Sequence, residues 1–256
     1  MWSDLELEAG DGERLVGSWT GDPAAQRVVV AFSGFGGQRL NSTNTQLAAR
    51  LNGQGWAVVA VDLSGHGDSS GEIRHQTLSR AAAQISDVLG LVRQRWDSAR
   101  IAVLGNSFSA SAALLAVSAG MDVDAMALKS PVPDYVEMRT LMLGAAGMAT
   151  WLREGTVLLP FGAWSDVAFL KDAQTIDVYG AVERTGCPLL AVHGSEDEGL
   201  SHRSQALFEE AVRRSGHRYV LVEGADHVLS DPHFAPAIET FSAFLDEALS
   251  LQGRHA

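Results

Sequence analysis

Ile101-Ala-Val-Leu-Gly-Asn-Ser-Phe-Ser109 joins an apolar run directly to an alanine-rich stretch, with Ser107 at the junction. The apolar residues Ile101–Leu104 predict a buried strand, and the stretch after Ser107 predicts a helix. A tight turn between them brings strand and helix so close that the flanking residues must be small, as Gly105 and Ser109 are. A junction of this kind exposes a serine hydroxyl, so Ser107 is the candidate nucleophile.

Two observations show that the Gly-x-Ser triplet alone does not identify Ser107 as a nucleophile. The chain holds a second Gly-x-Ser triplet, Gly67-Asp68-Ser69, which lacks the strand–turn–helix setting. The usual G-x-S-x-G pattern also has glycine where this chain has Ser109. A serine that merely caps the helix is the alternative interpretation, so the assignment depends on whether partner residues follow in the right places.

Apolar strands and helical stretches alternate on both sides of this junction. The predicted strands are Asp4–Ala9, Arg14–Thr20, Arg27–Phe32, Ala57–Val61, Ile101–Leu104, Val123–Leu128, Leu189–His193 and Tyr219–Val222. The predicted helices are Asn41–Asn52, His75–Trp96, Ser107–Ala119, His202–Arg214 and Pro236–Leu249. Continuous apolar strands alternating with helices indicate an α/β fold, with a mostly parallel, eight-stranded sheet covered by helices on both faces.

Residues 131–182 interrupt this alternation. They are rich in large apolar side chains but carry no strand signal, and we interpret them as an inserted helical cap, or lid. The core is then formed by residues 1–130 and 183–256. Most apolar side chains of the cap are expected to pack it onto the sheet. Met142, Trp151 and Trp164, with Phe35 and Phe108 from the core, are the candidates for lining a substrate pocket.

Composition limits the partners of the chain. A net charge of −12 argues against nucleic acid and anionic membranes, which bind clusters of Lys and Arg. Cys187 is the single cysteine, so no disulfide can form within the chain. No signal peptide, membrane-spanning run or cluster with metal-ligand spacing is evident. We therefore expect a cytoplasmic protein without metal or cofactor; its oligomeric state is left open.

A serine nucleophile needs a base and a carboxylate, and both are available later in the chain. His227 lies in the loop that leaves the predicted strand Tyr219–Val222, which suits a base. Asp197 follows the strand Leu189–His193 and suits the carboxylate that orients the base, with its exposed-looking neighbours Glu196 and Glu198 as alternatives. The order Ser, Asp, His is itself typical of one class of hydrolase.

The fourth requirement is a pair of backbone N–H donors for the oxyanion formed in acyl transfer. One is expected from Phe108, directly after Ser107. The other is assigned to Phe35, in the loop Ser33-Gly34-Phe35-Gly36-Gly37 after the strand Arg27–Phe32. His193 ends a strand within an apolar run and is expected to support the loop that follows it.

Together these residues resemble the α/β-hydrolase superfamily over nearly the whole chain. Asp62-Leu63-Ser64-Gly65-His66-Gly67-Asp68-Ser69 resembles the D-x-x-G-H-G-x-S signature of the serine aminopeptidase and monoacylglycerol-lipase-like branch. The resemblance implies that this loop is structural and that His66 is not catalytic. The chain departs from the branch at Ser33, where the oxyanion motif H-G-x-x-G has histidine.

The first functional hypothesis is hydrolysis of an ester of a small hydrophobic molecule through an acyl-enzyme. A lyase or acyltransferase that eliminates or transfers an acetyl or other acyl group in natural-product biosynthesis is the second, since the same residues serve it. A ligand-binding protein that retains the fold without turnover is the third. Elimination leaves a dehydrated product and hydrolysis an alcohol, so product analysis distinguishes the first two.

Overall fold

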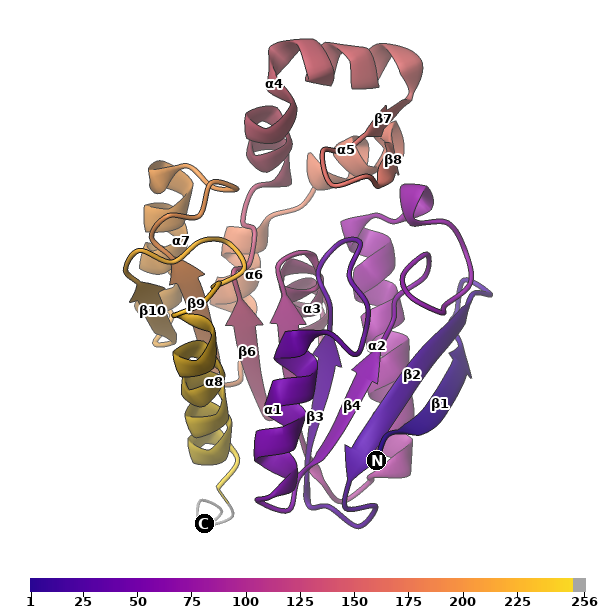
Figure 1. Cartoon of the computed structure of the whole chain (residues 1–256), viewed down its shortest axis with the longest axis vertical. Coiled ribbons are helices and arrows are strands. Elements are labelled where there is room, and N and C mark those ends of the chain that lie inside the picture. Colours follow the sequence, from indigo (N-terminus) through magenta and orange to yellow (C-terminus); the bar gives the residue numbers. More distant parts are fainter. Residues whose placement is uncertain (251–256) are drawn as a thin grey trace.

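An eight-stranded mixed sheet forms the centre of the computed structural model, which describes residues 1–250 (Figure 1). Its strands are β1 (Ser3–Glu8), β2 (Arg14–Gly21), β3 (Arg27–Phe32), β4 (Ala57–Val61), β5 (Arg100–Asn106), β6 (Ala125–Lys129), β9 (Leu189–Gly194) and β10 (Arg218–Val222). Their order across the sheet is β1-β2-β4-β3-β5-β6-β9-β10. Only β2 pairs antiparallel with its neighbours, β1 and β4, and the remaining pairs are parallel. The predicted fold is therefore confirmed.

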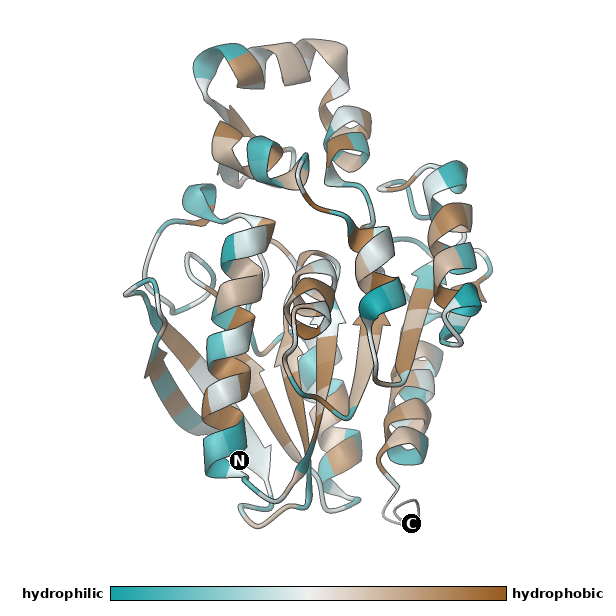
Figure 2. Cartoon of the chain, turned by 180° about the vertical axis from the view of Figure 1, so that it is seen from behind, coloured by the Kyte–Doolittle hydropathy of each residue, from teal (hydrophilic) through white to brown (hydrophobic). Residues whose placement is uncertain are grey.

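Helices cover both faces of this sheet. α1 (Ser42–Asn52) and α8 (Phe234–Ala248) pack on one face. The other face carries α2 (Leu78–Arg95), α3 (Phe108–Ser118), α6 (Val178–Arg184) and α7 (His202–Arg214). The central strands, enclosed between the two layers, are apolar along their length (Figure 2). A strand buried on both faces needs apolar side chains in both directions, which is why these runs do not alternate in polarity.

Side-chain caps set several helix boundaries. The Asn41 side chain accepts a hydrogen bond from the N–H of Asn44 at the start of α1. Thr77 does the same for Arg80, so α2 begins at Leu78, three residues later than the sequence predicted. A short 3-10 turn, Ile73–His75, ends at the first residue predicted for that helix. Such oxygens satisfy N–H groups that have no partner within the helix.

The segment 131–182 differs from its prediction in two respects. It holds α4 (Tyr135–Glu154) and α5 (Val167–Ala173), but also the strand pair β7 (Thr156–Leu158) and β8 (Trp164–Asp166). The expectation of an all-helical segment is wrong, because a three-residue strand is too short to leave a periodic signal. In addition, most of α6 falls within the segment, yet this helix packs against α3 and α7 in the layer that covers the sheet.

α4, β7, β8 and α5 lie together beyond the carboxyl ends of the parallel strands (Figure 1). α4 is interrupted at Gly144, whose φ of 64° is left-handed and separates two helical parts. The last six residues of the predicted core, 251–256, lie outside the described residues. The loops that follow β3, β5, β6, β9 and β10 all leave the sheet at the same edge, which is where parallel α/β sheets place their sites.

Candidate active site

Ser107 occupies a strained turn between β5 and α3. Its φ of 51° and ψ of −108° lie outside the regions that residues with side chains ordinarily adopt. The approach of the two elements is close enough that a Cβ on Gly105 would lie 2.4 Å from the Cα of Ala110. The sequence predicted a small residue two positions before the serine, and the structure narrows this to glycine.

Ser109, which replaces the usual second glycine, is built into the turn. Its hydroxyl accepts a hydrogen bond from the N–H of Asn106 at 2.9 Å and lies 3.0 Å from the carbonyl oxygen of Phe32, to which it can donate. The side chain is fully buried. Since the hydroxyl links the turn to β3, serine at this position ties two strands together where glycine would only leave space.

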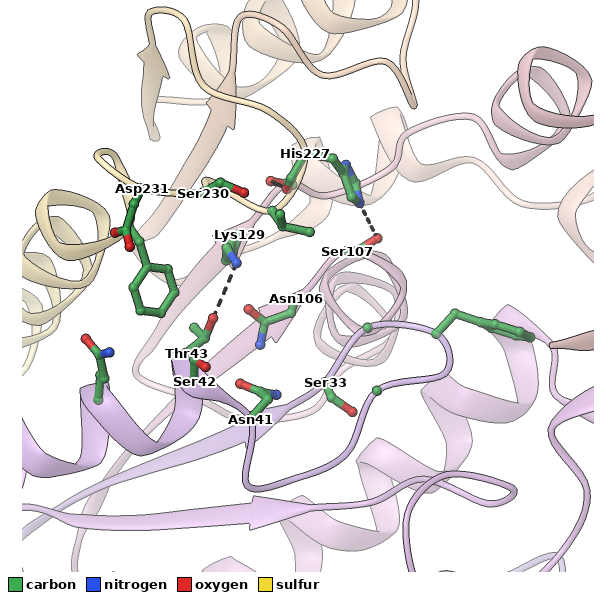
Figure 3. Close-up of a pocket in the computed structure, with 17 residues that line it drawn as sticks. Ser33, Asn41, Ser42, Thr43, Asn106, Ser107, Lys129, His227, Ser230 and Asp231 are labelled. Atoms are coloured by element: carbon green, nitrogen blue, oxygen red, sulfur yellow. Dashed lines mark hydrogen bonds between the residues drawn. The ribbon is translucent and has the colours of Figure 1, made fainter. Parts of the chain in front are cut away.

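The loops after β9 and β10 bring the two predicted partners to Ser107. The Ser107 hydroxyl lies 2.8 Å from Nε2 of His227, and Nδ1 of the same ring lies 2.7 Å from Oδ2 of Asp197 (Figure 3). A carboxylate only accepts, so Nδ1 carries the proton and Nε2 is free to accept one from the hydroxyl. The three predicted residues thus form one continuous hydrogen-bonded chain.

Asp197 is distinguished from its acidic neighbours by burial. Its side chain is shielded from solvent and also accepts the N–H of Gly199 at 2.9 Å, whereas Glu196 and Glu198 are exposed. The alternatives left open by the sequence therefore do not reach His227. The His227 loop is itself held by the Ser130 hydroxyl, which donates to the His227 carbonyl oxygen at 2.6 Å.

His193 was expected to support the loop after its own strand, but its hydrogen bond goes to the segment after β6. Its Nε2–H donates to the carbonyl oxygen of Pro131 at 2.7 Å, and the ring is fully buried. Burial lowers the pKa of His193 to about 4, so the ring is neutral at ordinary pH. His193 therefore supports the chain between β6 and α4 and does not compete with His227.

The loop after β3 lies directly against Ser107. A Cβ on Gly34 would sit 3.4 Å from the Cβ of Ser107, which is ordinary van der Waals contact. Phe35 follows within a turn closed by the Gly37 N–H and the Gly34 carbonyl oxygen, and Phe108 is the first residue of α3. Within the described residues, no hydrogen bond uses the backbone N–H of Phe35 or of Phe108. Both N–H groups are thus available to a ligand.

The signature loop that includes His66 has internal partners. The fully buried Asp62 pairs with Arg39, and a Cβ on Gly67 would collide with that carboxylate. His66 is buried, its Nδ1 lies 3.0 Å from the Ser64 carbonyl oxygen, and its pKa is lowered by burial. In the described part of the chain, His66 makes no hydrogen bond or ring contact with Ser107 or His227, and its ring packs against Phe35 and Phe108. These contacts fit a structural role.

A cleft of about 650 Å³ opens beside Ser107 and His227. Its wall includes Phe35, Val228 and Phe234, and most of the residues that line it carry polar side chains (Figure 3). The polar lining residues are Ser33, Asn41, Ser42, Thr43, Gln46, Asn106, Ser107, Lys129, Ser130, His227, Ser230 and Asp231. The cleft lies on the side of the sheet covered by α1 and α8, away from the core beneath α2 and α3.

The predicted pocket residues of segment 131–182 do not line this cleft. Trp151 is fully buried and stacks on Phe169 at 6.4 Å between ring centroids. Met142 packs against the core, and Trp164 on β8 is half exposed. Phe108, also predicted, is buried within the core, and of these candidates only Phe35 reaches the cleft. Most large apolar side chains of this segment pack it onto the core. Composition alone does not distinguish such packing residues from residues that line a pocket.

A buried arginine connects segment 131–182 to the loop after β3. The guanidinium of Arg139 on α4 lies over the rings of Phe35, at 5.4 Å, and Phe169, at 4.9 Å. Burial lowers its pKa to about 10. Phe35 also meets Phe161 edge-on at 6.2 Å. Contacts from α4, α5 and the β7–β8 turn therefore converge on the residue that offers one free N–H beside Ser107.

Two cleft residues, Lys129 and Asn106, were missed by sequence reasoning. A signal was present, since Lys129 is a charged residue directly after the apolar run of a parallel strand, where such sheets place ligands. Asn106 lies inside the Gly-x-Ser triplet itself, but only its position in space shows that its side chain enters the cleft.

The fold and the elbow together define the class: the chain is an α/β-hydrolase. The family model described as serine aminopeptidase, S33, matches residues 23–165, which is more than half of the chain. The chain therefore belongs to that family of α/β-hydrolases.

Solved structures share the architecture at low sequence identity. Est1E from Butyrivibrio proteoclasticus, solved with ferulic acid, superposes with a TM-score of 0.81 at 22% identity, covering 97% of this chain and 98% of that one. The Pyrococcus furiosus esterase PF2001 gives a TM-score of 0.73 at 21% identity, covering 97% and 92%. DcsB, solved with a substrate analogue, gives 0.78 at 16% identity, covering 97% and 99%. No curated protein matches the chain significantly.

Two negative findings hold for the part of the chain that the structure describes. None of its helices is both long and apolar enough to cross a membrane. Within residues 1–250, no group of three or more His, Cys, Asp or Glu side chains is arranged to hold a metal ion.

Proposed function

We propose that the chain is a serine hydrolase that cleaves carboxylic esters of small molecules through an acyl-enzyme. The observation that carries the proposal is the hydrogen-bonded chain from Ser107 through His227 to Asp197, with both distances below 3 Å. Membership of the S33 family and the low-identity likeness to solved esterases support the same chemistry.

The mechanism follows from which atoms can donate and accept. The Ser107 hydroxyl transfers its proton to Nε2 of His227 as its oxygen attacks the ester carbonyl. Asp197 accepts from Nδ1–H throughout and stabilises the imidazolium that forms. The free N–H groups of Phe35 and Phe108 are proposed to bind the oxyanion. His227 then protonates the leaving alcohol, and a water molecule activated by the same ring releases the acid.

The proposal assigns a capping function to α4, β7, β8 and α5. Their contacts with the Phe35 loop, through Arg139, Phe161 and Phe169, would transmit their position to one oxyanion donor. The sequence favoured a small hydrophobic substrate, with Met142, Trp151 and Trp164 as pocket candidates. Since the cleft beside Ser107 is lined by many polar side chains as well as by Phe35, Val228 and Phe234, we propose an ester that carries both polar and apolar groups.

Turnover of a panel of p-nitrophenyl esters and labelling by a fluorophosphonate test this function. Ser107→Ala should lose labelling and all but a residual turnover, since nucleophile removal in such sites costs about 10⁶-fold. Ser118→Ala, at the end of α3, is the matched control and should retain both. Wild-type turnover in Ser107→Ala would overturn the assignment, whereas a dehydrated product from an acylated substrate would favour elimination.

A further inference from the structure

Lys129 is placed inside the cleft by strand register. It is one of only two lysines in the chain and ends β6, where its backbone pairs with Asn106 of β5. Residues in register on neighbouring strands direct their side chains to the same face. Both side chains line the cleft, and both residues are 8% exposed. The Lys129 carbonyl oxygen also accepts the N–H of Ser107 at 2.8 Å, so the lysine and the nucleophile share one rigid junction.

The side chains of Lys129 and Asn106 lack some of the hydrogen bonds that they can form. An ammonium has three donors, but Lys129 Nζ makes a single hydrogen bond, at 3.3 Å, to the Thr43 hydroxyl. Oδ1 of Asn106 is buried without a hydrogen-bond partner in the described structure. A buried polar group without partners is costly, so native proteins keep few of them and often at ligand sites. The arrangement leaves two donors of the Lys129 ammonium for a ligand in the cleft.

The charges around Lys129 limit what this ligand can be. No carboxylate oxygen of the described residues lies within 4.0 Å of Nζ, and the ring of Phe234 lies 5.7 Å away. Asp226 acts on the lysine only at longer range, and its carboxylate is engaged by the Ser230 N–H and hydroxyl. Asp231 also lines the cleft, and His227 borders it. One cation among acidic residues favours a singly charged anion over a doubly charged phosphate.

Lys129 carries its charge at neutral pH even though it is buried. Burial lowers the pKa of its ammonium to about 8, and the negative charge of Asp226 opposes that shift. A buried ammonium that lacks a carboxylate partner is stabilised by any ligand that brings one, because charge-assisted hydrogen bonds are the stronger kind.

We propose that Lys129, assisted by Thr43, binds a free carboxylate on the substrate, so that the preferred substrates are acid-bearing esters such as the half-esters of short dicarboxylic acids. The claim that the bound molecule is a substrate rests on the proposed ester hydrolysis at Ser107. Binding of the carboxylate itself is measurable without turnover.

Calorimetry on the non-hydrolysing variant Ser107→Ala tests the binding. The probes are monoethyl glutarate and its neutral counterpart, the ethyl ester of glutaramic acid, which differ in one charged group. The acid is expected to bind at least about 10-fold more tightly than the amide, from the strength of charged hydrogen bonds. Adding Lys129→Met should remove this preference, whereas Lys171→Met, which neutralises the exposed lysine of α5, should leave it unchanged.

Each outcome of these measurements tests one part of the proposed carboxylate site. Equal binding of acid and amide to Ser107→Ala, or a preference that survives Lys129→Met, overturns the carboxylate site. Tighter binding of methyl phosphate than of acetate overturns the singly charged assignment. If the Lys129 variant does not fold, competition answers the question in the wild type: glutarate should inhibit turnover of a neutral ester more strongly than glutaramide. Carboxylate binding in a protein that hydrolyses no ester would refute the proposed function alone.

Discussion

At the scale of single residues, burial decides which acid serves His227. Glu196, Asp197 and Glu198 are consecutive, but only Asp197 turns inward, where the Gly199 N–H and the His227 ring hold its carboxylate. Spacing along the chain favoured Asp197 without excluding its neighbours. The two nitrogens of His227 then have different partners, so the tautomer of the ring follows from the identity of the acid.

Replacing Asp197 by Asn therefore tests the tautomer. An amide at this position can donate to Nδ1 and stabilise the tautomer whose Nε2 carries a proton and cannot act as base. We expect Asp197→Asn to lower kcat by about 10³- to 10⁴-fold, as in other triads. Steady-state kinetics with a p-nitrophenyl ester measure the loss, and circular dichroism checks the fold. Glu196→Gln is the control, and a comparable loss there would contradict the assignment.

At the scale of elements, the junction of β5 and α3 controls the site. The turn holds Ser107 at a positive φ, and the fully buried Ser109 hydroxyl connects the same turn to β3. β3 in turn leads into the loop that lies against Ser107. The proposed nucleophile Ser107 and the proposed oxyanion donors Phe35 and Phe108 thus share one set of strand contacts, so their spacing depends on how closely β5 and α3 approach.

Gly105→Ala tests this dependence. The added Cβ would lie 2.4 Å from the backbone of Ala110, a contact that only a shift of α3 can relieve. We expect a destabilisation of at least about 2 kcal/mol, typical of overpacking against backbone, together with loss of activity. Urea unfolding gives the free energy. Gly90→Ala, in α2 with open space around the added Cβ, is the control and should be neutral or stabilising by up to about 1 kcal/mol.

At the scale of the whole molecule, the layered fold buries groups that titrate. His193 is enclosed between the sheet and α7, with its Nε2–H bonded to Pro131 and its Nδ1 without a partner. A protonated Nδ1 would have no acceptor there, so the folded state resists protonation. On the other face of the sheet, burial in the cleft likewise lowers the pKa of the Lys129 ammonium.

His193 should make the fold sensitive to acid. Its folded pKa of about 4 lies below the 6.5 of an unperturbed ring, so between these values the unfolded chain binds more protons. The stabilisation is complete above pH 6.5 and is lost as pH falls toward 4, by up to about 3 kcal/mol. Urea unfolding at pH 7 and pH 4.5 measures it. His193→Gln should flatten this dependence, whereas substitution of the exposed His202 should not, and an unchanged slope in His193→Gln would contradict the account.

The sequence by itself determined the strand–helix alternation, the elbow and the order of its partners, because local periodicity and small residues leave signals a few positions wide. Strand β3 and helix α7 have the predicted boundaries for this reason. Only the tertiary structure decided that Asp197, and neither Glu196 nor Glu198, contacts His227. It also decided that Met142, Trp151 and Trp164 lie away from the cleft and that Lys129 lies inside it. Those outcomes depend on burial and register between strands distant in sequence, and a linear pattern does not record either.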